Sequence, residues 1–372
     1  MTFLSSGGLS LHQRRLRLSR NSLIGDSVLY SLLRPALFLT DAETAHGLSL
    51  AALRVMPLSA ASAVDLRLSQ VVAGLHFANP VGLAPGYDKN AEVPAAILRL
   101  GFGFTEVGTL TPLPQEGNAR PRLFRLVEDH AVINRMGFNN DGLAAAASRL
   151  SNWSRKKHNG ILGINVGANK DSADRVGDYV VGVKAMASFA DYLTINVSSP
   201  NTPGLRALQD KAALDDLLAA VMAARVDATP IFLKVAPDLE PADIDDIVQV
   251  AIERGIAALI VSNTTISRPP LKSRYAGESG GLSGAPLRDL AQQRLRDFRA
   301  SSGGEIPLIG VGGIASADDA YARIRAGASL VQIYSALVYE GPGLAKAINR
   351  GLVRLLKRDG FASIADAVGV DA

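Results

Sequence analysis

Two patterns of hydrophobic and polar residues follow one another along this chain, and they predict different structures. Within residues 27–57, apolar side chains recur at helical spacing in two runs, separated by a break at Thr40 and Asp41, either of which can cap the second run. Pro57 ends that run. We predict two short amphipathic helices, which can dock on the main body, lie on a membrane surface, or do both.

From residue 78 onward, short apolar runs rich in β-branched residues alternate with helical stretches such as 212–226, 242–254 and 317–326. This alternation is typical of βα units around a parallel sheet. The predicted strands are 80–86, 103–109, 161–167, 192–198, 230–236, 257–263, 307–313 and 329–335. Eight such units close most naturally into a barrel. We therefore predict an α/β fold, a (β/α)8 TIM barrel over residues 78–372 with a small N-terminal two-helix extension at 27–57.

Two insertions interrupt the repeat. Residues 119–134 are predicted to form a hairpin after the second strand, and the polar, glycine-rich residues 266–284 a loop after the sixth. Both would lie on the face where the strands end, and long loops there usually carry function.

Composition excludes several kinds of chemistry. The chain has 372 residues, of which 48% are hydrophobic and 20% charged, as expected of a globular protein. It contains no cysteine, which rules out disulfides, thiolate zinc sites, an iron–sulfur cluster on this chain and a cysteine nucleophile or base.

The net charge of +4 is concentrated in residues 1–26, which are predicted to form a basic, flexible arm carrying four arginines and no acid before Asp26. The remainder of the chain sums to about zero, which disfavours nucleic-acid binding. Such an arm suits an anionic membrane surface, and a solvated tail without function is the alternative. No apolar run near the N-terminus is long enough to cross a bilayer. Residues 1–25 superficially resemble a mitochondrial presequence.

Glycines follow the seventh predicted strand, in the segment 310–314, and Tyr334 and Ser335 follow the eighth. Barrels of this kind commonly bind phosphate on backbone N–H groups at these two positions. We therefore predict a phosphate site, with ordinary tight turns as the alternative.

Amide and ammonium side chains also gather at the predicted strand ends. An amide offers both a donor and an acceptor, which complements the edge of a pyrimidine or a flavin. The asparagines are Asn134, Asn165, Asn196, Asn201 and Asn263. Lys89 and Lys234 supply positive charge, and Lys234 lies within an otherwise apolar strand, which disfavours a surface role.

Other catalytic groups are missing from these positions. None of the five histidines stands at a predicted strand end, and no acidic or histidine cluster has metal-ligand spacing. We therefore predict no metal site. A Ser-His-Asp triad around Ser198 or Ser199 is disfavoured for the same reason.

Several long motifs occur in a specific order across about residues 28–360. They are GYDKNAE (86–92), VGTLTPLPQEGNARPRLFRL (107–126), INRMGFNNDG (133–142), INVGANK (164–170), NVSSPNTPGLR (196–206), SNTT (262–265), GGLSG (280–284), GVGGI (310–314) and YSALVY (334–339). Together they resemble the dihydroorotate dehydrogenase family, specifically its class 2, membrane-associated and quinone-dependent form.

The resemblance implies an enzyme of pyrimidine (UMP) synthesis that oxidises (S)-dihydroorotate to orotate, with one FMN per chain as hydride acceptor. The implied cofactor-binding residues are Pro85, Gly86, Tyr87, Asp88, Lys89, Thr109, Asn165, Asn196, Lys234, Ser262, Gly284, Gly313, Tyr334 and Ser335. The implied substrate-binding residues are Lys89, Asn134, Arg135, Met136, Gly137, Phe138, Asn196, Asn201, Asn263 and Thr264.

The family's catalytic base corresponds to Ser199, which would remove a proton from C5 while hydride leaves C6. Serine is a poor base without an activating neighbour. Our hypothesis is therefore that Thr202 or an ordered water relays the proton. Class 1 forms use cysteine as the base, so a chain without cysteine cannot belong to that class.

In class 2 the N-terminal helices form the mouth through which ubiquinone, or another membrane quinone, reaches the flavin. The implied quinone path passes His46, Arg125 and Tyr334. The resemblance further implies a peripheral protein on the cytoplasmic side of a bacterial inner membrane, with no iron–sulfur partner subunit. The mitochondrial inner membrane is the alternative, disfavoured because no transmembrane segment follows the arm.

Two other functions remain open on the residues alone. A flavin barrel could reduce uracil-like bases in RNA, although the nearly neutral barrel argues against RNA. A non-redox phosphate-binding barrel, an isomerase or lyase, would leave the asparagines and Lys234 without a purpose.

Overall fold

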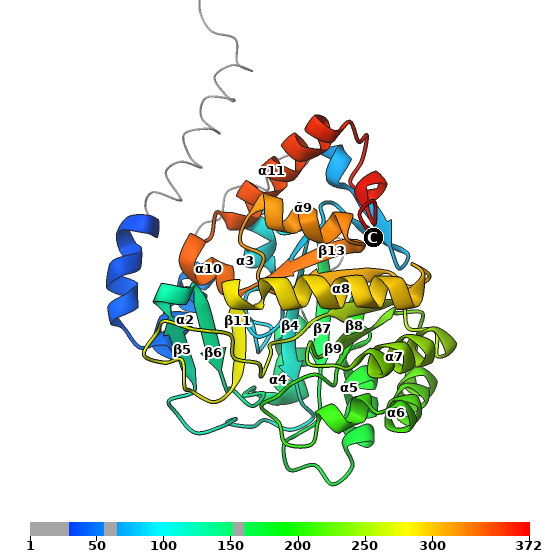
Figure 1. The fold of residues 1–372 in the computed structure, drawn as a ribbon. Helices are drawn as coiled ribbons and strands as arrows, with labels where there is room; N and C mark the ends of the chain where they lie inside the picture. The colour runs from blue at the N-terminus through cyan, green and yellow to red at the C-terminus, as the bar shows by residue number, and fades with distance from the viewer. Residues whose placement is uncertain (1–29, 56–64, 152–159) are drawn as a thin grey trace, which may run out of the picture.

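The computed structural model describes residues 30–55, 65–151 and 160–372. The predicted arm at 1–26, the first residues of the first helix and the stop at Pro57 lie outside them. Eight parallel strands close into a barrel in the order in which they follow along the chain (Figure 1). These strands are β3 (Val81–Leu83), β4 (Phe104–Leu110), β7 (Ile161–Val166), β8 (Tyr192–Asn196), β9 (Ile231–Val235), β10 (Ala258–Val261), β12 (Leu308–Val311) and β13 (Ala328–Ile333).

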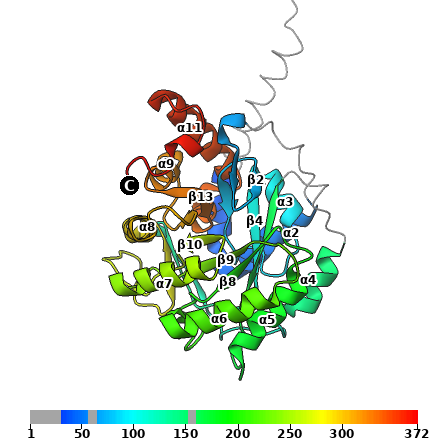
Figure 2. The same cartoon turned by 90° about the vertical axis from the view of Figure 1, so that its right-hand side faces the viewer.

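Helices surround the barrel (Figure 2). Their apolar faces pack on the outer face of the strands. They are α3 (Pro94–Arg99), α4 (Gly142–Leu150), α5 (Arg175–Met186), α6 (Lys211–Ala224), α7 (Pro241–Glu253), α8 (Arg288–Ser302), α9 (Ala317–Arg325), α10 (Ser335–Glu340) and α11 (Leu344–Asp359). Short 3-10 turns are η1 (Leu66–Leu68), η2 (Val127–Asp129), η4 (Arg206–Gln209), η5 (Ala285–Leu287) and η6 (Ala365–Ala367). Each predicted barrel strand overlaps an observed one.

A small hairpin precedes the barrel and was not part of the sequence prediction. It consists of β1 (Gln70–Val72) and β2 (Leu75–Phe77). Phe77 packs edge-to-face on Phe104, and both belong to an aromatic cluster with Tyr192 inside the barrel. The hairpin therefore covers the amino-terminal end of the barrel, leaving the carboxyl end for a site.

The insertion at 119–134 forms the predicted hairpin, with strands β5 (Leu123–Leu126) and β6 (Ala131–Asn134). The prediction that 266–284 is a loop was wrong at its end. Residues Gly281–Gly284 form β11, which pairs antiparallel with β6 and completes a three-stranded sheet. A run of Gly and Ser has turn composition and weak strand propensity, so only the distant partner strand reveals β11.

Two helices lie outside the barrel, as predicted. Residues 30–39 form the first, and α2 (Ala42–Val55) the second, with Asp41 accepting the backbone N–H of Thr44 at its start, 2.9 Å away. Tyr30 and Arg34 tie the first helix to α10 through the carbonyls of Val338 (2.6 Å) and Tyr339 (2.9 Å). The apolar side chains between these ties are not covered.

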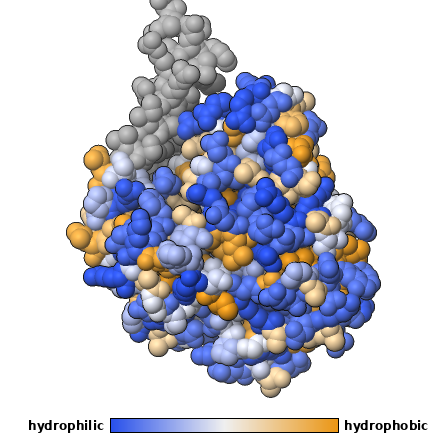
Figure 3. All heavy atoms as spheres, in the orientation of Figure 1, coloured by the Kyte–Doolittle hydropathy of each residue, from blue (hydrophilic) through white to orange (hydrophobic). Residues whose placement is uncertain are grey.

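The large exposed apolar side chains on these two helices are those of Leu32 (72%), Leu33 (51%), Leu39 (90%), Leu48 (52%) and Val55 (81%). Hydrophobic surface gathers at this edge of the molecule (Figure 3). No helix in the described part of the chain is long and apolar enough to span a bilayer.

Candidate active site

A single continuous cavity of about 1220 Å³ occupies the carboxyl end of the barrel and extends between α10 and the two N-terminal helices. Most of the predicted site residues line it, and the structure brings together groups from seven of the eight strand ends, all but that of β7, and from both insertions. Those lining it are His46, Pro85, Gly86, Tyr87, Lys89, Thr109, Arg125, Asn134, Met136, Gly137, Phe138, Asn196, Ser199, Asn201, Lys234, Ser262, Asn263, Thr264, Gly284, Gly313, Tyr334 and Ser335.

Three predicted site residues do not line the cavity. Asp88 is buried and accepts the backbone N–H groups of Glu92 and Val93, each at 2.8 Å, just before α3 begins. Arg135 turns away to pair with Glu278 at 2.8 Å. Asn165 lies beneath the cavity, fully buried. The buried side chains of Asp88 and Asn165 therefore support the site from behind its surface, whereas that of Arg135 does not face it.

A chain of hydrogen bonds runs from Glu106 to the strand ends. Asn165 donates to Glu106 Oε1 (2.7 Å) and accepts from the Asn196 amide (3.1 Å). Asn196 Oδ1 in turn accepts from Ser198 Oγ (2.8 Å), whose oxygen accepts from the Asn263 amide (2.8 Å). A buried network in which each amide has a partner fixes rotamers, so Asn196 and Asn263 are held in defined orientations.

Glu106 was missed by the sequence analysis. It is fully buried in β4 and also accepts from Tyr192 (3.1 Å) and Gln332 (2.7 Å). A charged residue inside the apolar run FTEVGTL is the same signal that singled out Lys234, so it could have been found.

Both predicted lysines present ammonium groups to the cavity. Among the described residues, neither ammonium group makes a hydrogen bond or an ion pair, although Lys234 is only 5% exposed. Burial lowers the pKa of Lys234, against the nearby Glu106 carboxylate, which raises it. Burial lowers the pKa of Lys89 to about 8, again partly opposed by acidic neighbours. Buried cations without partners call for an anionic or oxygen-bearing ligand.

Two glycines in the wall of the cavity leave backbone open to a ligand. Gly284 and Gly313 have φ of +94° and +71°. A Cβ on Gly313 would lie 2.4 Å from the Cα of Arg288, so no other residue fits there. Behind this loop the buried Arg323, which the sequence analysis did not single out, donates to the carbonyl of Gly312 at 2.8 Å.

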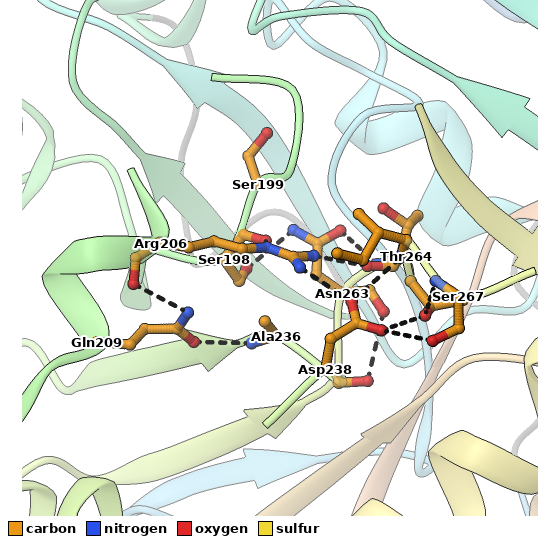
Figure 4. A network of polar contacts seen from close by, with 12 residues as sticks. Ser198, Ser199, Arg206, Gln209, Ala236, Asp238, Asn263, Thr264 and Ser267 are labelled. Atoms are coloured by element: carbon orange, nitrogen blue, oxygen red, sulfur yellow. Dashed lines mark hydrogen bonds and ion pairs between the residues drawn. The ribbon is translucent and has the colours of Figure 1, made fainter. Parts of the chain in front are cut away.

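Ser199 lies at the rim of the cavity in the loop after β8 and is 5% exposed. Its Oγ accepts the backbone N–H of Asn201 at 3.2 Å, and in Figure 4 its side chain points away from the surrounding polar network. The Oγ of Thr202 is buried and has no hydrogen-bond partner among the described residues. An unpartnered hydroxyl three residues from Ser199 agrees with the relay hypothesis without testing it.

Aromatic rings line the passage toward the N-terminal helices. His46 packs edge-on against Tyr87, which packs edge-on against Tyr334, with centroid distances of 5.2 and 5.9 Å. Burial, and then Lys89, lower the pKa of His46 to about 3, so the imidazole is neutral at physiological pH. Arg125 donates to the carbonyls of Leu37 (3.0 Å) and Phe38 (3.3 Å), which fixes the end of the first helix.

The closed parallel barrel and the amide and ammonium side chains that line the cavity at its strand ends define this protein as a (β/α)8-barrel enzyme. Its residues 67–356 match the protein family described as dihydroorotate dehydrogenase. The chain belongs to the dihydroorotate dehydrogenase family, which confirms the resemblance seen in the motifs.

Relatives and solved structures agree with this assignment. "Dihydroorotate dehydrogenase (quinone)" of Sphingopyxis alaskensis is 64% identical over 345 residues, covering 92% of this chain and 97% of that one. The protein of the same name from Novosphingobium aromaticivorans is 64% identical over 344 residues, covering 91% and 99%. The crystal structure of DHODH from Eimeria tenella in complex with ferulenol has a TM-score of 0.85 and 41% identity, covering 89% and 96%. The TIM-barrel prediction is confirmed.

The family is flavin-dependent, and the site fits such a group. The fit rests on two features of the cavity wall, the buried, unpartnered ammonium of Lys234 and the glycine-lined backbone around Gly313. A positive charge beside the ring tunes a flavin, and backbone N–H groups can bind a phosphate.

Proposed function

We propose that this chain oxidises (S)-dihydroorotate to orotate in UMP biosynthesis, with one FMN per chain as hydride acceptor and ubiquinone as the final electron acceptor. One observation carries the proposal. A single cavity joins Ser199 and two unpartnered lysines at the strand ends to an apolar mouth between the N-terminal helices. The quinone-dependent names of the relatives at 64% identity support the same function.

The FMN phosphate would bind at Gly284, Gly313, Tyr334 and Ser335, and its ring near Thr109, Asn196, Lys234 and Ser262. When bound, the flavin accepts hydride from C6 of dihydroorotate and passes two electrons to a quinone. Lys234, held in β9, would supply fixed positive charge in a water-poor setting, where such charge acts most strongly. Identifying the flavin released from the denatured protein by mass tests FMN specifically.

The substrate would lie between Lys89 and the amides of Asn134, Asn196, Asn201 and Asn263, with its carboxylate toward the ammonium group. Ser199 would take the C5 proton as hydride leaves C6, which forms the C5–C6 double bond of orotate. In this role Ser199 acts as the general base.

The pKa of Lys89 predicts an alkaline limit to substrate binding. A lysine is charged only below its pKa, which burial lowers to about 8, so the carboxylate loses its counter-charge as pH rises past that value. We expect kcat/KM for dihydroorotate to fall by up to about tenfold per pH unit above that point. Because arginine stays protonated over this pH range, kcat/KM of the Lys89→Arg variant should not fall in this way. A wild-type profile that stays flat from pH 7 to 10 would contradict the assignment.

The quinone path would pass the neutral His46, Arg125 and Tyr334 on the way from the exposed leucines of the two helices. An apolar helix face of this kind lies in the membrane interface, where quinones dissolve. Quinone-dependent members of the family are membrane-associated. We place this chain peripherally on the cytoplasmic side of a bacterial inner membrane, and vesicle flotation with and without residues 1–56 tests this location.

An anaerobic titration tests the function. The purified protein should show visible flavin bands that bleach on addition of dihydroorotate and recover on addition of a ubiquinone analogue. A yellow protein that does not bleach would retain the flavin barrel and overturn the substrate. A protein that stays colourless after added FMN would favour a phosphate-binding isomerase instead.

A further inference from the structure

We propose that Arg206 is a positioning residue that clamps the loop carrying Ser199 to the loop carrying Asn263 and Thr264, and so sets the geometry for proton removal. The inference rests on the proposed function. It names a residue outside the lining of the cavity, since the part of the cavity wall that the structure describes does not include Arg206.

The guanidinium of Arg206 contacts three different loops with separate nitrogen atoms (Figure 4). Nε donates to the carbonyl of Ser198 at 3.0 Å, in the loop after β8. Nη2 donates to the carbonyl of Thr264 at 3.0 Å, in the loop after β10. Nη1 donates to Asp238 Oδ2 at 2.9 Å, in the loop after β9. One rigid, planar group therefore fixes three neighbouring strand ends relative to one another.

Asp238 extends the clamp further along the loop after β10. Its Oδ1 accepts from the hydroxyls of Thr265 and, at 3.3 Å, Ser267. Its Oδ2 also accepts the backbone N–H of Ile266 at 3.1 Å. The carboxylate thus holds three consecutive residues immediately after Thr264, and Arg206 supplies its counter-charge.

The clamp acts next to the proposed base and substrate ligands. Ser198, whose carbonyl Arg206 holds, is bonded directly to Ser199 and receives the Asn263 amide on its hydroxyl at 2.8 Å. The same guanidinium therefore sets the distance between the proton acceptor and two residues proposed to orient the substrate. A misplacement of about 1 Å at reacting atoms can cost on the order of 10²-fold in rate.

An ordinary stabilising ion pair is the competing explanation, because Arg206 is 22% exposed and Asp238 14%. If the pair only stabilises the fold, its loss would reduce the amount of folded protein. The rates of both half-reactions would then fall by the same factor. A positioning residue would affect the half-reaction in which Ser199 takes part. It would leave the reoxidation of reduced flavin by quinone unchanged.

The test uses the full chain with its flavin and compares Arg206→Gln, Arg206→Lys and Arg254→Gln. Arg254 is the matched control, because it makes a bidentate pair with Asp215, both bonds 2.6 Å, on the exposed surface of α6 and α7. We expect Arg206→Gln to slow single-turnover flavin reduction by dihydroorotate about 10- to 100-fold, with kcat falling more than KM changes. Arg206→Lys should recover part of the rate, and Arg254→Gln should behave as wild type.

Reoxidation of dithionite-reduced Arg206→Gln by a ubiquinone analogue should stay within about twofold of wild type, since the mouth is untouched. Wild-type reduction rates in Arg206→Gln, or equal losses in both half-reactions, would overturn the proposal. If Arg206→Gln does not fold, Asp238→Asn decides in the same assay. That variant keeps the side chain's shape but removes its charge and replaces one of the two accepting oxygens with a donating amide nitrogen. An unchanged rate of flavin reduction would overturn the clamp.

Hydrogen exchange separates this inference from the proposed function. Arg206→Gln should speed backbone exchange in both 198–206 and 262–267, and Arg254→Gln in neither. If the wild-type protein does not bleach with dihydroorotate, the proposed function fails while exchange still decides whether the clamp exists. Unchanged exchange in both segments would overturn the clamp even in an active enzyme.

Discussion

Replacing Ser199 with alanine is expected to slow flavin reduction by dihydroorotate about 10²- to 10⁴-fold, the usual contribution of a positioned general base. The hydroxyl is the proposed proton acceptor, which the loop after β8 presents to the cavity. The unpartnered Thr202 hydroxyl lies three residues further along the same loop. Stopped-flow bleaching of the flavin under anaerobic conditions measures this step directly. The affinity for orotate should change little. It is measured from the change that bound orotate causes in the flavin spectrum.

The control for this variant is Ser301→Ala, which removes a hydroxyl from the surface of α8, where it donates to Asp245 at 2.6 Å. It should reduce at the wild-type rate. Reoxidation of reduced Ser199→Ala by a quinone analogue should also be normal. If the flavin of Ser199→Ala bleaches at a near-normal rate, the serine is not the base. The hypothesis of a proton relay through Thr202 is then wrong as well.

Deleting residues 1–56 should lower quinone-dependent turnover by at least about tenfold, because it removes the apolar wall of the mouth. That wall is formed by side chains such as Leu33, Leu48 and Leu53. The carboxyl end of the barrel keeps its own lining, so flavin reduction by dihydroorotate should survive. Comparing turnover with a ubiquinone analogue and anaerobic bleaching on one preparation separates the two effects.

Deleting only residues 1–25 provides the matched truncation, because it leaves helix 30–39 and α2 in place. Both half-reactions with a soluble quinone should then be intact. Full quinone activity after the longer deletion would show that the two helices do not form the mouth. Loss of bleaching after the longer deletion would instead show that the two helices support the substrate site.

Local sequence determined the barrel well because each strand carries its own signal. Runs such as FTEVGTL and YLTIN are buried on both faces, and buried parallel strands are continuously apolar. Lys234 was predicted to be functional from the same kind of local signal, because a cation within a buried apolar strand is costly unless it has a partner. The start of the helix Ala42–Val55 was likewise predicted, because Asp41 caps it.

Contacts between segments far apart in the sequence could not be predicted in this way. The weak strand β11 exists because β6, about 150 residues earlier, offers it a hydrogen-bonding edge. Asn165 stands at a strand end like the other asparagines, but Glu106 and Asn196 take up its amide beneath the cavity. The hydrophobic period of the sequence does not predict which of several similar polar side chains will have a buried hydrogen-bond partner.

The sequence by itself therefore determined the barrel, the strand-end chemistry and, through its motifs, the family. Hydrophobic period and residue type are local properties, and motifs preserve their order along the chain. The tertiary structure decided that the strand ends and the helical mouth share one cavity, and that Arg206 joins three loops. Those features depend on how far apart chain segments lie in space, which only closure of the barrel sets.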